Sequence, residues 1–180
     1  MEAPTDSPTA AEPGTTVPVP LVDPVRDPAG FVRETQGVVW RFIAAQVDPG
    51  SADDLTQETY LRAFRSLSEF AGRSSARTWL LAIARHVCAD HIRTQQRRRK
   101  LEARLPEPGV TPDAASLVGM IDLVRALSEE RREAFVLTQV LGLSYEEAAV
   151  TVGVPIGTIR SRVARARSQL VAQVTAARAS

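Results

Sequence analysis

The stretch from Leu143 to Arg167 constrains the fold more than any other part of the sequence, because it carries helix start and stop signals in a fixed order. Ser144 is followed three residues later by Glu147, which is the pattern of a capping box at the start of a helix. Gly153 tolerates the positive φ of a tight turn, and Pro155 suits the first turn of a following helix. This order predicts a helix-turn-helix.

The second helix of this pair combines an apolar stripe with one-sided positive charge. Ile159, Val163 and Leu170 lie near one stripe for packing, and no Asp or Glu occurs from Ala148 to Ser180. Arginine contacts guanine and phosphate in the major groove. Capping, turn and charge together favour DNA binding over a helical hairpin with a solvated basic face. The arginines concerned are Arg160, Arg162, Arg165 and Arg167.

The formal net charge of +1 conceals an uneven distribution of charge along the chain. Residues 1–28 hold five acids, one base and seven prolines, a composition that predicts a disordered tail. Between Arg73 and Arg104, nine bases stand against Asp90 and Glu102. Positive charge is thus concentrated around 73–104 and 160–178, which indicates two separate contacts with a polyanion.

Composition also limits the chemistry that the chain can perform. The single Cys88 excludes an intrachain disulfide and a cysteine-based zinc cluster. His86 and His91 are five residues apart and do not share a helical face, so we expect no metal and no cofactor; His86 is expected to pair with Asp90. No apolar run approaches the roughly 20 residues of a membrane span, and the amino terminus lacks a signal pattern, so we expect a cytoplasmic protein without membrane insertion.

The hydrophobic periodicity is helical throughout and shows no strand signal, which predicts an all-α protein of two small helical domains joined by a flexible linker. Helices are expected over 31–47, from Ser51 or Ala52 to 67, and over 76–100, then from 117 to 127 and from Ser128 to 142. The predicted organisation is a disordered tail (1–28), a first domain (29–100), a proline-containing linker (101–117) and a second domain (118–176).

The helix that follows the Asp48-Pro49-Gly50 break has two distinct faces. Its acid and amide face carries Asp54, Gln57, Glu58 and Leu61 at positions i, i+3, i+4 and i+7. The other face carries Tyr60, Ala63, Phe64 and Leu67 and is expected to pack into the core, as is Trp79 on the next helix.

Several of these stretches, in this order, resemble sigma-70-family transcription initiation factors. Residues 54–64 (DLTQETYLRAF) resemble region 2.2, 74–80 (SSARTWL) region 2.3, 82–93 (AIARHVCADHIR) region 2.4, and 142–167 region 4.2. The short layout, with only domains two and four, resembles the extracytoplasmic-function (group four) sigma factors, particularly the actinobacterial sigma C type. The resemblance covers about residues 30–175.

The resemblance implies a role for each region. The acid and amide face (Asp54, Gln57, Glu58 and Leu61) would dock on the β′ coiled coil of core RNA polymerase, while domain four would contact the β flap. The −10 element would be read and opened by Arg73, Ser74, Ser75 and Arg77 with Arg85 and Arg93 further along the helix. The −35 element would be read by Arg160, Ser161, Arg162 and Arg165. An anti-sigma factor is an expected further partner.

Two other classes of protein compete with this interpretation. A stand-alone helix-turn-helix regulator would leave residues 51–100 unexplained, because neither a sensor nor a dimer interface is recognisable. An enzyme is not expected, because the sequence shows no nucleophile–base pattern, phosphate-binding glycine loop or ligand cluster.

Overall fold

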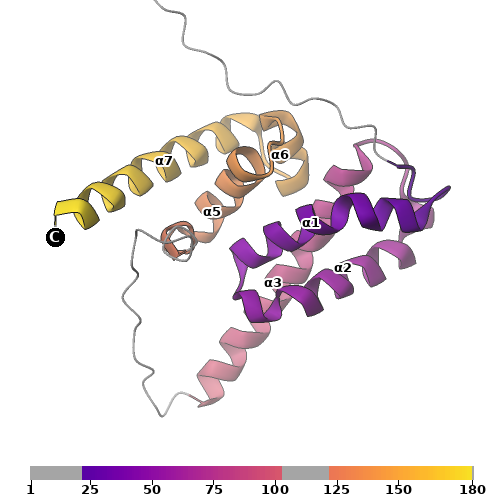
Figure 1. The fold of residues 1–180 in the computed structure, drawn as a ribbon, viewed down its shortest axis with the longest axis horizontal. Coiled ribbons are helices and arrows are strands. Elements are labelled where there is room, and N and C mark those ends of the chain that lie inside the picture. Colours follow the sequence, from indigo (N-terminus) through magenta and orange to yellow (C-terminus); the bar gives the residue numbers. More distant parts are fainter. Residues whose placement is uncertain (1–21, 103–121, 180) are drawn as a thin grey trace, which may run out of the picture.

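The computed structural model describes residues 22–102 and 122–179, and every regular element in these ranges is helical, in agreement with the predicted fold class (Figure 1). We call residues 22–102 the N-terminal unit and residues 122–179 the C-terminal unit. Most of the predicted tail (residues 1–21) and of the predicted linker (residues 103–117) lies outside the described residues. The domain boundaries therefore stay predictions.

Three long helices build the N-terminal unit: α1 (Pro28–Gln46), α2 (Ala52–Arg65) and α3 (Ala76–Glu102). Helix α1 begins three residues before the expected start, because the Asp27 carboxylate accepts a hydrogen bond from Gly30 N at 2.8 Å and Pro28 opens the helix. The last part of the predicted tail is thus an ordered turn, in which Pro24 is buried. Short 3₁₀ turns, η1 (Pro49–Ser51) and η2 (Leu67–Glu69), flank α2.

The inner face of α2 differs from the predicted one. Tyr60 and Ala63 are buried as expected, but Phe64 is 39% exposed and stacks on Tyr60 at the edge of the unit. Thr56 and Thr59 take the inner positions instead. The prediction for Phe64 was wrong because the α2 face that packs against α1 and α3 consists of residues 56, 59, 60 and 63, and Phe64 lies beside it.

The C-terminal unit contains a helical turn at residues 122–125, α5 (Glu129–Phe135), the π-helical segment η3 (Val136–Val140), α6 (Tyr145–Val152) and α7 (Ile156–Ala179). The capping box is present: Ser144 Oγ accepts from Glu147 N at 3.1 Å, and Glu147 Oε2 accepts from Ser144 N at 2.9 Å. Gly153 has a φ of 77°. Both observations confirm the predicted helix-turn-helix, in which Ile159 and Val163 are buried on the inner side of α7.

The two units pack against each other, which the sequence did not predict. Helix α3 lies against α6, and α1 lies against α5 and η3 (Figure 1). The buried apolar residues form one continuous cluster that extends through both units, from Phe31 and Leu81 to Leu137 and Ile159. None of the helices in the described ranges is long and apolar enough to cross a membrane.

Candidate protein and nucleic-acid interfaces

The acid and amide face of α2 lies on the surface of the N-terminal unit. Asp54 and Gln57 are exposed, and Leu61 keeps 47% of its surface exposed. Glu58 is half-buried because its Oε1 accepts a hydrogen bond from Arg62 Nε at 2.7 Å. The structure thus brings the four predicted residues together on one open face.

Arg62, which the sequence did not single out, connects this face to α3. Its Nη1 lies 2.8 Å from Asp90 Oδ2, while Arg93 Nη1 approaches Asp90 Oδ1 at 3.2 Å. Hydrogen bonding by Arg62 lowers the pKa of the Asp90 carboxyl, and both acids raise the pKa of Arg62. The sequence predicted that Asp90 pairs with His86. In the structure its ion-pair partners are Arg62 and Arg93 instead.

A groove beside this face, between α1 and α2, was also missed by the sequence reasoning. Its volume is about 350 Å³. Trp40, which is 38% exposed, borders the groove and donates from Nε1 to Asp53 Oδ1 at 2.8 Å. The spacing of Val32, Gln36 and Trp40, one helical turn apart, was the available signal.

Of the predicted −10 residues in the loop before α3, some have side chains free to bind and others are already hydrogen-bonded within the chain. Arg73 is exposed, and Ser74 makes only a long 3.5 Å hydrogen bond to the Ser75 carbonyl. Ser75 caps α3: its Oγ accepts from Thr78 N at 3.1 Å and lies 2.7 Å from Thr78 Oγ1. The Ser75 hydroxyl is therefore engaged in starting the helix.

Arg77 and Arg85 both reach across to the C-terminal unit. Arg77 is half-buried, and its Nη2 donates to the Leu141 carbonyl oxygen at the end of η3; burial lowers the pKa of its guanidinium. Arg85 Nε lies 2.7 Å from Glu133 Oε1 on α5. Burial raises the pKa of the Glu133 carboxyl although Arg85 and Arg162 act in the opposite direction. Arg93, by contrast, is exposed.

Two further arginines of the C-terminal unit hold the carboxyl end of α1. Arg125 Nη2 donates to the carbonyl oxygens of Ala44 at 2.8 Å and Val47 at 3.0 Å. Arg132 Nε donates to Gln46 Oε1 at 3.2 Å. Since the end of a helix carries unpaired carbonyls and partial negative charge, these contacts are favourable. We call the set of Arg77, Arg85, Arg125 and Arg132 with their acceptors the interunit latch.

On α7 the predicted −35 residues face outward. Arg160, Ser161 and Arg165 are exposed, and Arg162 is half-buried. Ser161 Oγ donates to the Thr158 carbonyl at 2.9 Å, which leaves its lone pairs available. Arg167, by contrast, donates to Gln139 Oε1 and thereby fastens α7 to η3. In the described ranges no cluster of three or more metal-binding side chains occurs.

Family models match both units. The model of Sigma-70 region 2 matches residues 31–98, and that of Sigma-70 region 4 matches residues 118–170. The order of the two matches agrees with the motifs read from the sequence, and a stand-alone helix-turn-helix regulator does not explain the first.

Named relatives and a solved structure agree with these matches. The chain is 53% identical over 148 residues to the probable RNA polymerase sigma-C factor of Mycobacterium bovis, covering 79% of this chain and 80% of the relative. It is 29% identical over 157 residues to the ECF RNA polymerase sigma-E factor of Haemophilus influenzae, covering 78% and 81%. The sigma factor RpoE of Bartonella quintana, solved with the anti-sigma factor NepR, superposes with a TM-score of 0.73 at 28% identity, covering 83% of this chain and 98% of that chain. The chain belongs to the extracytoplasmic-function (ECF) group of sigma-70-family RNA polymerase sigma factors.

Proposed function

We propose that this ECF sigma factor docks on core RNA polymerase through the acid and amide face of α2, and that its free form is closed by the interunit latch. Opening the latch then frees the residues that read and melt the −10 element. The observation that carries the proposal is an asymmetry: the docking face is open, whereas Arg77 and Arg85 are engaged by the C-terminal unit.

The docking face suits a basic helical partner. Asp54 and Glu58 supply negative charge, Gln57 supplies an amide, and exposed Leu61 supplies apolar area at the carboxyl end of this face. We expect the β′ coiled coil of polymerase to bind here. A basic side chain of this partner would compete with Arg62 for the Glu58 carboxylate.

Promoter reading is divided between the two units. On the N-terminal unit, Arg73 and Ser74 remain available in the loop, and Arg93 is exposed on α3. Arg77 and Arg85 are engaged by the C-terminal unit and would join them after the latch opens. On α7, Arg160, Ser161 and Arg165 form the open side of the recognition helix, with Arg162 beside them. These groups suit the −10 and −35 elements respectively.

The closed arrangement and DNA binding compete for Arg85. The Glu133 carboxylate accepts a hydrogen bond from Arg85 Nε at 2.7 Å, and a promoter phosphate would need the same guanidinium. The Leu141 carbonyl accepts from Arg77 Nη2 in the same way. Separation of the units would make both guanidinium groups fully available to a phosphate or a base edge.

Further partners fit this arrangement. The C-terminal unit would hold the β flap of polymerase, and an anti-sigma factor would bind the free chain, as NepR binds the Bartonella sigma factor. The site of action is then the cytoplasm, where the polymerase works. The family acts by specifying promoters, and we propose no catalytic residue for this chain.

Association with core polymerase tests the docking face. The double variant Asp54→Arg with Glu58→Arg is expected to lose holoenzyme formation in gel filtration and promoter-dependent transcription, with an unchanged circular dichroism spectrum. A matched control, Glu69→Arg with Glu130→Arg, carries the same change of charge on exposed residues elsewhere and is expected to bind normally. Normal holoenzyme formation by the first double variant would overturn the assignment of the face.

A further inference from the structure

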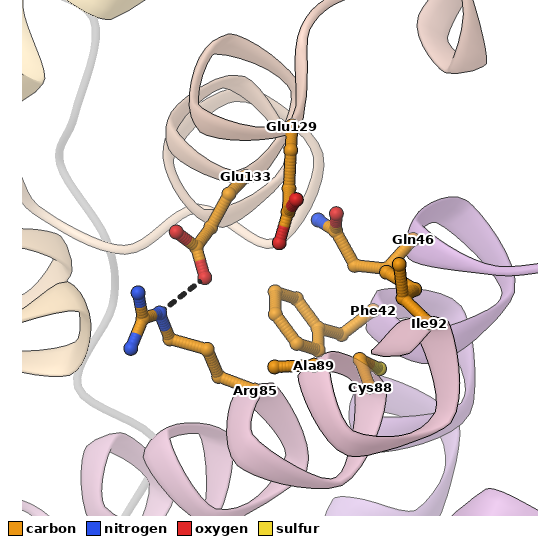
Figure 2. A pocket seen from close by; sticks show the side chains of 8 residues that line it. All are labelled: Phe42, Gln46, Arg85, Cys88, Ala89, Ile92, Glu129 and Glu133. Atoms are coloured by element: carbon orange, nitrogen blue, oxygen red, sulfur yellow. Dashed lines mark hydrogen bonds and ion pairs between the residues drawn. The ribbon is translucent and has the colours of Figure 1, made fainter. Parts of the chain in front are cut away.

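A small cavity lies where α1, α3 and α5 meet, and one of its walls is the single cysteine of the chain (Figure 2). Cys88 is 3% exposed and lies one helical turn from Arg85 on α3. The other lining residues are Phe42, Gln46, Ala89 and Ile92 of the N-terminal unit, and Glu129 and Glu133 of α5. Docking and promoter reading, as proposed above, do not use this thiol.

Helix α5 keeps the thiol unreactive in the closed arrangement. Burial, with the Glu133 and Glu129 carboxylates adding to it against Arg132, raises the pKa of Cys88 to about 12. Since the thiolate is the nucleophile, the closed form presents almost none near neutral pH. Both carboxylates come from the C-terminal unit, so both leave when the units separate.

A second observation is a buried hydrogen-bond donor beside the thiol that has no partner in the part of the chain that the structure describes. Gln46 is 7% exposed and lines the same cavity; its Oε1 accepts from Arg132, but its Nε2 has no partner among the described residues. Figure 2 shows the Gln46 amide turned toward the cavity. A buried amide donor without an acceptor costs roughly 1–3 kcal/mol, so a group bearing oxygen acceptors would be stabilised beside it.

The charge of the groups near the Cys88 thiol changes from negative to positive when the units separate. What remains near it on the N-terminal unit is the freed Arg85 guanidinium and the Gln46 amide. Cationic and amide donors favour a thiolate and an anionic reagent, whereas carboxylates oppose both. The open form therefore offers a more accessible and more reactive thiol than the closed one.

We propose that Cys88 is a thiol-modification site that opens only when the two units separate, and that it takes low-molecular-weight disulfides bearing carboxylates. The Cys88 thiolate, its proton released to water, attacks one sulfur of the disulfide; a new S–S bond forms, the original S–S bond breaks, and the other half leaves as a thiolate. Gln46 Nε2 and Arg85 donate to the carboxylate of the bound half.

The modified chain is then unable to close. The cavity accommodates about 20 Å³, which is space for little more than a water molecule. A disulfide-linked adduct exceeds this volume and adds negative charge beside Glu129 and Glu133. The adduct thus holds the units apart and leaves Arg77 and Arg85 free, which is a consequence that rests on the closed form proposed above.

Reaction of the full chain with 5,5′-dithiobis(2-nitrobenzoate), an anionic aromatic disulfide, tests the site. The wild type is expected to react slowly, and Arg125→Ala, which removes two latch contacts without altering a residue that lines the cavity, at least tenfold faster. Arg131→Ala, whose partner Gln169 lies within the C-terminal unit, is the matched control and is expected to react like the wild type. Cys88→Ser is expected to release no chromophore. Small-angle scattering is expected to show a larger radius of gyration for the adduct, reversed by dithiothreitol.

Equal rates for the wild type and Arg125→Ala would overturn the gating of Cys88, and an adduct as compact as the unmodified chain would overturn its effect on closure. Arg77→Ala, which removes the latch contact to the Leu141 carbonyl without altering a residue that lines the cavity, provides a second latch variant if Arg125→Ala fails to fold, as judged by circular dichroism. Failure here is distinguishable from failure of the docking proposal, because Cys88→Ser is expected to form holoenzyme and the α2 double variant is not.

Discussion

Arg85 on α3 and Glu133 on α5 form an ion pair of 2.7 Å between the two promoter-reading units. The Glu133 side chain is 9% exposed and that of Arg85 is 35% exposed. The carboxylate is therefore shielded from water, whereas the guanidinium is partly accessible. One residue expected to contact the −10 element thus forms part of the contact that closes the free chain. Closure and promoter melting compete for the same guanidinium.

Removing the carboxylate is expected to open the chain. Glu133→Ala removes the acceptor of the Arg85 Nε hydrogen bond, and we expect closure to weaken by about 1 kcal/mol, because partial exposure of Arg85 screens the pair. Small-angle scattering measures the change as a larger radius of gyration. Glu130→Ala, on the exposed side of the same helix, is the control; an equal expansion in both variants would contradict a specific role for Glu133.

The same pair makes closure dependent on pH. Burial raises the pKa of Glu133 in the closed chain above its ordinary value of 4.5, so closing takes up protons. Closure is therefore favoured as pH falls from neutrality toward 4.5 and weakens as pH rises through the raised pKa. Arg85, Glu129 and Arg162 are the charged groups that act on the same carboxyl. Scattering between pH 5 and 8 measures the trend, and Glu133→Gln should abolish it; more opening at low pH would contradict the assignment.

Two glycines of the helix-turn-helix are expected to respond oppositely to alanine. Gly153 has a φ of 77° with open space around it, so Gly153→Ala should destabilise the chain by roughly 1–2 kcal/mol through backbone strain alone. Gly157 lies inside α7, also in open space and without a positive φ, so Gly157→Ala should stabilise it by roughly 0.5–1 kcal/mol. Thermal unfolding measures both, and the same sign for the two would show that the turn is misplaced.

The exposed arginines of α7 are expected to separate into base and phosphate readers. Arg160→Ala or Arg165→Ala at a base contact should cost about 1–3 kcal/mol on the native promoter only. At a phosphate contact it should weaken binding to all promoters and reduce the salt slope by about one. Holoenzyme binding to promoters mutated base by base measures both, with Arg131→Ala as the control. Unchanged binding in both α7 variants would place −35 recognition elsewhere.

Local signals in the sequence were sufficient for the helix-turn-helix. The Ser144–Glu147 box and the Gly153 turn depend on residues within one helical turn, so their chemistry can be read in order along the chain. The outward position of Asp54, Gln57 and Leu61 followed from helical spacing in the same way. These parts of the fold and of the candidate site agree with the structure.

The interunit contacts could not be read from such signals. Arg77 and Leu141 are 64 residues apart, and Arg125 and Ala44 are 81 apart, with no local pattern to connect them. An arginine can bind a DNA phosphate, a carbonyl oxygen or a carboxylate with the same donors. The sequence therefore predicted that Arg85 binds DNA, whereas in the structure of the free chain it binds Glu133. The π-helical segment was missed because an apolar run does not distinguish the Leu141 N to Val136 O bond from an ordinary helical one.

Fluorescence energy transfer between the two units, with and without core polymerase, tests the central claim most directly. Dyes are attached to cysteines introduced at the exposed residues Gln96 and Ala172 in a Cys88→Ser background. We expect high transfer efficiency in the free chain and a marked fall on holoenzyme formation, with the same fall absent in the Asp54→Arg, Glu58→Arg variant. Unchanged efficiency in a holoenzyme that transcribes from its promoter would contradict the claim that polymerase opens a closed sigma factor.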